Sequence, residues 1–262
     1  MATALITGAS SGIGEAFAVE LAQRGMDVVL VARSEIKLQQ LAERLTSQHN
    51  IKAEVIVQDL TVPEAASAVY KAVQASGQSI DLLINNAGFG DYGVFGDRPR
   101  QKQLDMIQLN ITALVDLTHQ FLADMVKRQS GSIINVASIA AFQPLPYLSV
   151  YAATKAFVLS FSEALWEENR KHNVCVLAVC PGPTETQFFE AAEFPRTFAG
   201  SNQSATSSET VVQEALKALA AKQSNVVTGG IGNWLISNVS RIWPRQSLVS
   251  GVAKVMKPPQ DQ

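Results

Sequence analysis

The chain has 262 residues, of which 47% are hydrophobic and 17% charged, with 21 Lys and Arg against 23 Asp and Glu. The formal net charge of −2 gives a nucleic-acid partner no electrostatic support. This length suits one α/β domain with a large core, so residues 1–262 are predicted to form a single domain.

Cysteine spacing and hydropathy predict a cytoplasmic protein. Cys175 and Cys180 lie five residues apart in one apolar run, so on a strand they point to opposite faces and cannot bridge each other. Unpaired cysteines are typical of a reducing compartment. The N-terminal apolar run has no basic flank and ends at Gly8, and no run approaches the ~20 apolar residues of a membrane span. We predict no transmembrane segment and no metal site.

The N-terminal segment predicts a strand, a glycine turn and a helix. Residues Ala2–Thr7 form a short apolar strand, and a helix closed by Gly25 follows the turn. Backbone N–H groups at such a helix start bind a dinucleotide pyrophosphate, because glycine lets the chain approach closely. The predicted cofactor contacts in this turn are Gly8, Ser10, Ser11, Gly12, Ile13 and Gly14.

The same sequence allows a second interpretation. Residues 8–12 match the G-x-S-x-G nucleophile elbow of α/β-hydrolases, in which Ser10 would be the nucleophile. An elbow needs strands before it, however, and only seven residues precede Gly8. Nothing around His49, His119 or His172 suggests an oriented catalytic base. The hydrolase stays as an alternative.

The end of the second predicted strand, Asp27–Ala32, indicates which dinucleotide is bound. Ala32 stands where an acid would bind the ribose 2′-hydroxyl of NAD, and Arg33 follows it. A guanidinium can bind a 2′-phosphate through two hydrogen bonds. We expect no carboxylate beside Arg33 that would repel the phosphate. NADP(H) is therefore favoured over NAD(H). The alternative is a surface arginine paired with Glu35 or Glu64.

Repeated βα units predict the fold. Ser34 is expected to cap a helix that runs to about His49, and residues Thr61–Glu64 read as a capping box that starts another helix. This alternation predicts a doubly wound parallel sheet of the Rossmann type, with about seven strands and helices on both faces. The later strands are expected at 53–58, 81–85, 131–138, 175–180 and 225–228.

Tyr151 and Lys155 lie four residues apart in a predicted helix, so both side chains share one face. An ammonium about 5 Å from a phenol is expected to lower the phenol pKa by about two units, into the range of acid–base catalysis. Ser138 ends an apolar strand thirteen residues earlier, at the sheet edge where ligands bind.

Together, the glycine turn, Ser138 and Tyr151-Ala-Ala-Thr-Lys155 resemble the short-chain dehydrogenase/reductase family from Thr7 to about Thr186. The resemblance implies that Ser138 hydrogen-bonds the substrate oxygen and that Tyr151 is the general acid or base. It implies that Lys155 holds the nicotinamide ribose and lowers the tyrosine pKa. Asn110 would hold a proton-relaying water through its backbone carbonyl at a helix break, although an asparagine there can also cap a helix end.

The resemblance also implies further cofactor contacts. Asp59 and Leu60 match the family position that meets the adenine, although Asp59 also reads as an ordinary loop aspartate. Residues 85–88 match the N-N-A-G motif, and residues 181–186 match P-G-x-x-x-T. The contacts implied by these motifs are Asn86, Ala87, Gly88, Pro181, Gly182, Thr184 and Thr186.

Aromatic residues predict an apolar substrate. Residues 187–208 are expected to form a lid that begins with Phe188 and Phe189 and also holds Phe194 and Phe198. No Arg or Lys lies between Ser138 and Tyr151, which favours a small apolar or uncharged carbonyl substrate. The predicted pocket residues are Ser138, Ala140, Phe142, Tyr147, Phe188 and Phe189.

The C-terminal segment 232–257 alternates apolar and basic residues and holds no acid, and Pro244 is expected to split its helix. Such a segment can cover the pocket, pack on a second subunit or lie on an anionic membrane surface.

The combined prediction is an NADPH-dependent enzyme that interconverts carbonyl and alcohol groups by hydride transfer. The alternative on the same fold is a non-catalytic NADP-sensing protein. A homodimer or homotetramer is expected through the helices at 111–129 and 148–171.

Overall fold

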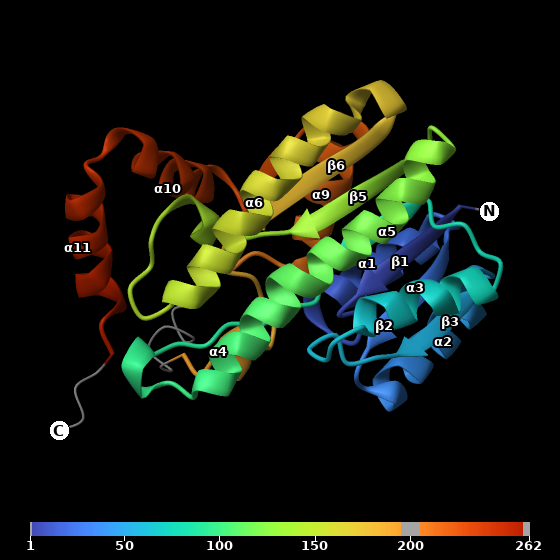
Figure 1. Ribbon diagram of the computed structural model, residues 1–262, viewed down its shortest axis with the longest axis horizontal. Helices are drawn as coiled ribbons and strands as arrows, with labels where there is room; N and C mark the ends of the chain where they lie inside the picture. The colour runs from blue at the N-terminus through green and yellow to red at the C-terminus, as the bar shows by residue number, and fades with distance from the viewer. Residues whose placement is uncertain (1, 195–204, 259–262) are drawn as a thin grey trace.

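The computed structural model describes residues 2–194 and 205–258, and Figure 1 shows their path. A seven-stranded sheet with the order β3-β2-β1-β4-β5-β6-β7 forms its centre, and every strand pair is parallel. The predicted doubly wound sheet is therefore confirmed. The strands are β1 Thr3–Thr7, β2 Asp27–Ala32, β3 Ala53–Val57, β4 Leu82–Asn85, β5 Gly131–Val136, β6 Val174–Pro181 and β7 Asn225–Thr228.

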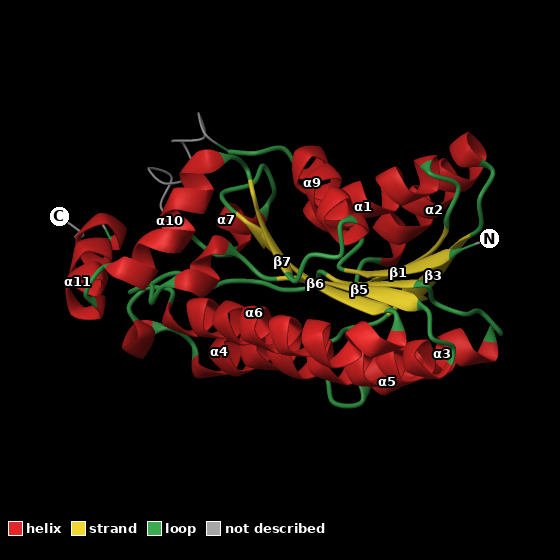
Figure 2. Cartoon of the chain, turned by 90° about the horizontal axis from the view of Figure 1, so that it is seen from above, coloured by secondary structure: helices red, strands yellow, loops and turns green. Residues whose placement is uncertain are grey.

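Helices cover both faces of this sheet (Figure 2). The α-helices are α1 Gly12–Gln23, α2 Glu35–His49, α3 Ala65–Ala75, α4 Arg100–Ile107, α5 Leu114–Lys127, α6 Ser149–Asn169, α7 Phe188–Ala191, α9 Ser208–Ala220, α10 Ile231–Ile242 and α11 Arg245–Met256. A π-helical turn, η2 Gln108–Ala113, joins α4 to α5, and short 3₁₀ turns lie at η1 Phe95–Asp97, η3 Ile139–Phe142 and η4 Arg170–His172.

The core consists of two apolar layers that the alternation of strand side chains separates. Ile6 and Leu30 pack with Phe17 of α1 in the layer under α1, α2 and α9. Leu5 and Val29 point the other way and pack in the layer with α3 and α5. Both faces of the central strands are buried, which is why these strands read as continuous apolar runs.

The predicted start of the third helix at Thr61 is wrong. This helix, α3, begins at Ala65 after Glu64, whose φ of 60° is left-handed, and Glu64 forms no side-chain cap. Thr61 instead donates its backbone N–H and its hydroxyl to Asp59 Oδ1, at 2.9 and 2.8 Å. This local turn competes with the capping box for the same threonine.

The strand order places the site, because the chain reverses direction across the sheet between β1 and β4. In open parallel sheets a crevice forms at such a reversal, outside the carboxyl ends of the strands. Thr7, Asn86, Ser138 and Pro181 all follow or end central strands at this edge.

The C-terminal helices α10 and α11 lie at the end of the molecule opposite α2 and β3 (Figures 1 and 2). Pro244 separates them, as predicted. In the described ranges, no helix has the length and hydropathy that a membrane crossing requires.

Candidate active site

The glycine turn between β1 and α1 is tightly packed. Gly8 has a φ of 66°, and a Cβ there would lie 2.8 Å from Asn86 Nδ2. A Cβ on Gly14 would overlap the Gly8 carbonyl oxygen. Side chains therefore cannot enter the turn, and the backbone N–H groups at the start of α1 stay accessible to an anion.

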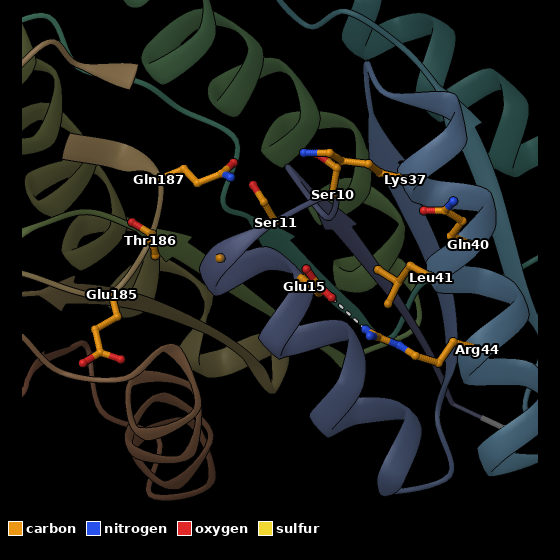
Figure 3. A pocket seen from close by; sticks show the side chains of 11 residues that line it. Ser10, Ser11, Glu15, Lys37, Gln40, Leu41, Arg44, Glu185, Thr186 and Gln187 are labelled. Carbon is orange, nitrogen blue, oxygen red and sulfur yellow. Dashed lines mark hydrogen bonds and ion pairs between the residues drawn. The ribbon is translucent and has the colours of Figure 1, made fainter. Parts of the chain in front are cut away.

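A cavity of about 630 Å³ opens beside this turn. Figure 3 shows side chains from α1, α2 and the segment after β6 around it. The hydroxyls of Ser10, Ser11 and Thr186 and the amine of Lys37 are donors to phosphate oxygens, so the lining fits a dinucleotide pyrophosphate. The lining residues are Ser10, Ser11, Gly12, Glu15, Lys37, Gln40, Leu41, Arg44, Glu185, Thr186 and Gln187. They include no histidine, so nothing here supports Ser10 as a hydrolase nucleophile.

Two cations line the cavity, and neither is the predicted Arg33. Arg44 forms an ion pair with Glu15 at 2.7 Å. Lys37 extends from α2 toward the turn that holds Ser10 (Figure 3). Lys37 was not among the predicted cofactor contacts; it lies in the first turn of α2, whereas Arg33 precedes that helix.

Arg33 lies near a carboxylate, which corrects the expectation that none is there. Burial acts to raise the pKa of Asp59, but hydrogen bonds from Thr61 and the charge of Arg33 lower it below its ordinary value. Of the two residues predicted to meet the adenine, Asp59 is thus tied into its own turn and Leu60 is buried in the core. Arg33 forms no ion pair with Glu35 or Glu64.

The segment after β4 is fixed to the glycine turn. The hydroxyl of Thr7 accepts the backbone N–H groups of Asn86 and Ala87, both at 3.0 Å. Asn86 Nδ2 donates to the Thr7 carbonyl at 3.0 Å. The N-N-A-G segment therefore holds two strand ends together, and its Gly88 approaches the site, because a Cβ there would lie 3.5 Å from Lys155 Nζ.

Asn110 lies inside the π-helical turn, so the predicted break in the helix is confirmed and no helix end is capped there. Its buried side chain donates to the Phe89 carbonyl at 3.0 Å and accepts the Phe89 N–H at 3.2 Å. It also donates to Thr154 Oγ1 at 3.1 Å. Asn110 thereby joins the loop after β4 to the helix that carries Tyr151 and Lys155.

Ser138, Tyr151 and Lys155 lie close together near the carboxyl ends of β5 and β6. Ser138 Oγ accepts the Ala140 N–H at 3.1 Å and hydrogen-bonds the Tyr151 phenol. Lys155 Nζ donates to the Val136 carbonyl at 2.7 Å and lies 5.8 Å from the centre of the Tyr151 ring. All three side chains that the sequence predicted to act together are therefore neighbours.

The expected lowering of the tyrosine pKa is wrong for this structure. Burial raises the pKa of Tyr151 to about 12, and only the hydrogen bond with Ser138 opposes it. Burial likewise lowers the pKa of Lys155 to about 8, so the ammonium is itself desolvated. The loss of water around the buried phenol outweighs the Coulombic gain that was expected from the Lys155 ammonium.

An aromatic cluster surrounds the Tyr151 ring. The Phe188 ring of α7 lies 5.2 Å from it, and Phe188 contacts Phe189 in turn at 5.8 Å. Of the predicted pocket residues, Ala140, Tyr147 and Phe188 pack around Tyr151. Phe142 does not, because it packs with Val158 and Ala178 in a separate part of the core. The structure adds Phe89, Tyr92, Phe194 and Met256 to this cluster.

The segment after β6 also reaches the site. A Cβ on Gly12 would lie 2.9 Å from Thr186 Cγ2, so the P-G-x-x-x-T segment borders the glycine turn. Thr184 donates to the Gly182 carbonyl at 2.9 Å and is buried, so it shapes this segment and does not line the cavity. Ile13 likewise packs against the core. Phe198 and lid residues 195–204 lie outside the described residues.

Ion pairs hold the segment just after α7, at the start of the predicted lid. Glu193, just after α7, pairs with Arg98 at 2.7 Å and Lys102 at 2.6 Å. Both cations also pair with the buried Asp91. The Tyr92 N–H donates to the Ala192 carbonyl at 2.9 Å, so the lid and the loop after β4 are joined by backbone as well.

Chemically, this arrangement places a buried phenol among apolar side chains and next to the Ser138 hydroxyl. Such a phenol can give a proton to, or take one from, an oxygen held by Ser138. In the described part of the chain, no group of three or more His, Cys, Asp or Glu side chains is placed to hold a metal ion.

Comparison with known proteins adds independent information. A family model described as short chain dehydrogenase matches residues 2–195. The very-long-chain 3-oxoacyl-CoA reductase of Anas platyrhynchos is 39% identical over 188 residues, covering 69% of this chain and 59% of that protein. This chain thus spans less than two thirds of that relative's length.

Solved structures also match the whole chain. A short-chain dehydrogenase from Sphingobium yanoikuyae in complex with NADPH has a TM-score of 0.83 and 32% identity, and the match covers 100% of this chain and 98% of that one. The bulky-bulky ketone specific alcohol dehydrogenase from Comamonas testosteroni has a TM-score of 0.78 and 31% identity, with 100% and 96% covered.

Proposed function

This chain belongs to the short-chain dehydrogenase family and is an oxidoreductase that acts on alcohol and carbonyl groups with NAD(P); on that premise we propose that it is an NADPH-dependent reductase of apolar ketones, including the 3-oxo groups of acyl chains. The observation that carries this proposal is the buried Tyr151 phenol, held between Ser138 and Lys155 and enclosed by aromatic rings.

The substrate class follows from the walls of the pocket. Phe89, Tyr147 and Phe188 present apolar surface around the reactive phenol. Arg98 and Lys102, which contact the described start of the predicted lid, are paired with Asp91 and Glu193, so neither is free to bind a substrate carboxylate. The names of relatives agree, since one reduces 3-oxoacyl-CoA and another is specific for bulky ketones.

The preference for NADPH rests on three residues of the β2–α2 connection. Ala32 places no acid against a 2′-phosphate, Arg33 follows it in the chain, and Lys37 supplies positive charge to the cavity itself. Asp59 weakens the argument from Arg33 because it lies within reach of the guanidinium charge. The proposed preference for NADPH therefore depends more on Lys37 than on Arg33. A structural relative that binds NADPH supports it.

The proposed roles follow from these positions. The bound nicotinamide supplies the hydride. Ser138 holds the carbonyl oxygen, and Tyr151 gives that oxygen a proton. Lys155 is proposed to hold the nicotinamide ribose, and Asn110 keeps the loop at Phe89 and Gly88 against the helix of Tyr151. The closed aromatic pocket excludes water from the reacting atoms.

A carbonyl panel tests this function. We expect the protein to consume NADPH with 3-oxoacyl thioesters and bulky aromatic ketones, and little with a small 2-oxo acid, followed by the absorbance of the reduced nicotinamide. Tyr151→Phe should reduce turnover at least ~10²-fold, because a positioned general acid contributes about 10²–10⁴-fold. Tyr70→Phe, which removes only a hydrogen bond to Asp124, is the matched control.

Other outcomes contradict the proposal. Normal turnover by Tyr151→Phe would remove the assigned acid, and better catalysis with the 2-oxo acid would remove the apolar substrate class. Release of the thiol from a thioester without NADPH consumption would instead support the hydrolase alternative through Ser10. The non-catalytic sensing alternative conflicts with membership of this enzyme family.

Cytoplasmic location and assembly into a homodimer or homotetramer remain predictions. The half-exposed Phe157 on α6 is consistent with a subunit contact at the predicted helices. Size-exclusion chromatography with light scattering would determine the subunit number.

A further inference from the structure

The helix α10 has its apolar side turned outward. Ile231, Leu235 and Val239 recur every four residues on one face and are 78%, 53% and 37% exposed. The opposite face carries Asn233 and Ser237, and Ser237 is 1% exposed. A helix on a protein surface normally buries its apolar face, so this orientation is reversed.

Hydrogen bonds explain why the polar side faces the protein. Asn233 Nδ2 donates to the carbonyls of Thr228 and Gly229, at 2.8 and 3.2 Å. A Cβ on Gly182 would overlap the Asn233 side chain, so this asparagine fills the space beside the P-G turn. The polar contacts of α10 at the end of β7 thus set its rotation, and its large apolar side chains remain outside.

Aromatic and basic side chains are also exposed on α11 and on both sides of the turn that joins it to α10. Trp234, Trp243 and Val255 are exposed, as are Arg245, Lys254 and Lys257. The sequence from Gly232 to Pro258 contains no Asp or Glu. Exposed tryptophans together with cations on an acid-free helical segment are the composition of helices that lie in a lipid headgroup layer.

The end of α11 adjoins the aromatic cluster around Tyr151. The Tyr92 hydroxyl donates to the Met256 carbonyl at 2.6 Å, at the end of α11. Met256 also packs in the cluster that surrounds Tyr151. In Figures 1 and 2, α10 and α11 form the end of the molecule remote from α2 and β3.

A second copy of the chain is a poorer occupant than a lipid surface. A two-fold contact would bring the same patch against itself, and Arg245, Lys254 and Lys257 would meet their own equivalents with no acid within the segment to pair them. An anionic bilayer matches both the exposed apolar side chains and the cations.

We propose that α10 and α11 form a docking surface for an anionic lipid bilayer, defined by Trp234, Leu235, Val239, Trp243, Lys254 and Lys257. The apolar face of α10 enters the headgroup layer, and the cations of α11 lie against lipid phosphates. Docking places the pocket that contains Tyr151 next to the membrane. It does not depend on the proposed carbonyl substrate.

Vesicle sedimentation of the full chain with bound NADPH tests the docking surface. We expect binding to vesicles of phosphatidylcholine with phosphatidylglycerol, weak binding to phosphatidylcholine alone, and release at high salt. Leu235→Ser with Val239→Ser, and separately Lys254→Glu with Lys257→Glu, should each weaken binding about tenfold or more. Ile36→Ser and Lys71→Glu, exposed on α2 and α3, are the matched controls and should bind as the unchanged protein does.

Tryptophan fluorescence gives a second readout. With Trp166→Phe as background, emission comes from Trp234 and Trp243 and should shift to shorter wavelength with anionic vesicles only. Equal binding of patch and control variants would overturn the proposal. A dimer that dissociates on Leu235→Ser with Val239→Ser, in light scattering without lipid, would assign the surface to a second copy instead. NADPH binding and thermal unfolding of each variant show that it is folded.

Discussion

At the scale of single residues, burial changes what the side chains can do. Tyr151 and Lys155 are neighbours, yet the phenol pKa is raised and the ammonium pKa is lowered, because both groups are removed from water. At the glycine turn, by contrast, the Lys37 side chain is exposed and lies beside an open cavity. The candidate site thus combines a buried end at Tyr151 and Lys155 with an open, polar end at the glycine turn.

Lys37 provides the test of cofactor choice at this scale. Lys37→Gln should weaken NADPH binding about tenfold and leave NADH binding within twofold, because a charge-assisted hydrogen bond to the 2′-phosphate is lost and NADH has no such group. Dissociation constants from nicotinamide fluorescence would measure this. Lys71→Gln on α3 is the control. Equal losses for both cofactors would assign Lys37 to the pyrophosphate.

At the scale of elements, two short helical segments position the residues around Tyr151. The π-helical turn η2 lets Asn110 point into the fold and hold Phe89 by two hydrogen bonds. The short helix α7 places Phe188 over Tyr151, and the ion pairs of Glu193 fix its end to Arg98 and Lys102. The position of α7, at the start of the predicted lid, therefore depends on charges that lie about one hundred residues earlier in the chain.

Breaking these ion pairs should loosen α7. Glu193→Gln is expected to speed hydrogen exchange of the Ala191 and Ala192 amides about threefold to tenfold, because partly exposed ion pairs each contribute about 0.2–1 kcal/mol. Hydrogen exchange read by mass spectrometry of the segment would measure it. Glu190→Gln, on the same helix and without an ion pair among the described residues, should leave exchange unchanged. If both variants behave alike, the ion pairs do not hold the lid.

At the scale of the whole molecule, the buried lysine links stability to pH. Its pKa is lowered from an ordinary value of 10.5 to about 8 in the fold, so between these values the unfolded chain binds more protons than the folded one. The free energy of unfolding contributed by Lys155 therefore rises as pH increases through this window. Tyr151 has a raised pKa, so its contribution to the free energy of unfolding falls as pH increases, but only above its ordinary pKa of 10.0.

Denaturant unfolding measures this linkage. The unfolding free energy of the unchanged protein, minus that of Lys155→Met, should increase by about 2 kcal/mol between pH 8 and pH 10. The same difference for Lys71→Met, an exposed lysine, should stay flat. A flat difference for Lys155→Met as well would mean that the lysine is solvated in the folded state.

The sequence by itself determined the parallel sheet, the glycine turn and the pairing of Tyr151 with Lys155. These are local signals, because strand and helix periods and glycine spacing act over a few residues. Only the tertiary structure decided the raised tyrosine pKa, the place of Lys37 in the cavity, the position of Phe142 in the core and the reversed face of α10. Each depends on burial or charge contributed by segments distant in the chain, and such contributions leave no periodic pattern in the sequence. The start of α3 was missed for a related reason, since Thr61 could bond either to its own helix or to Asp59, and the fold selected the second.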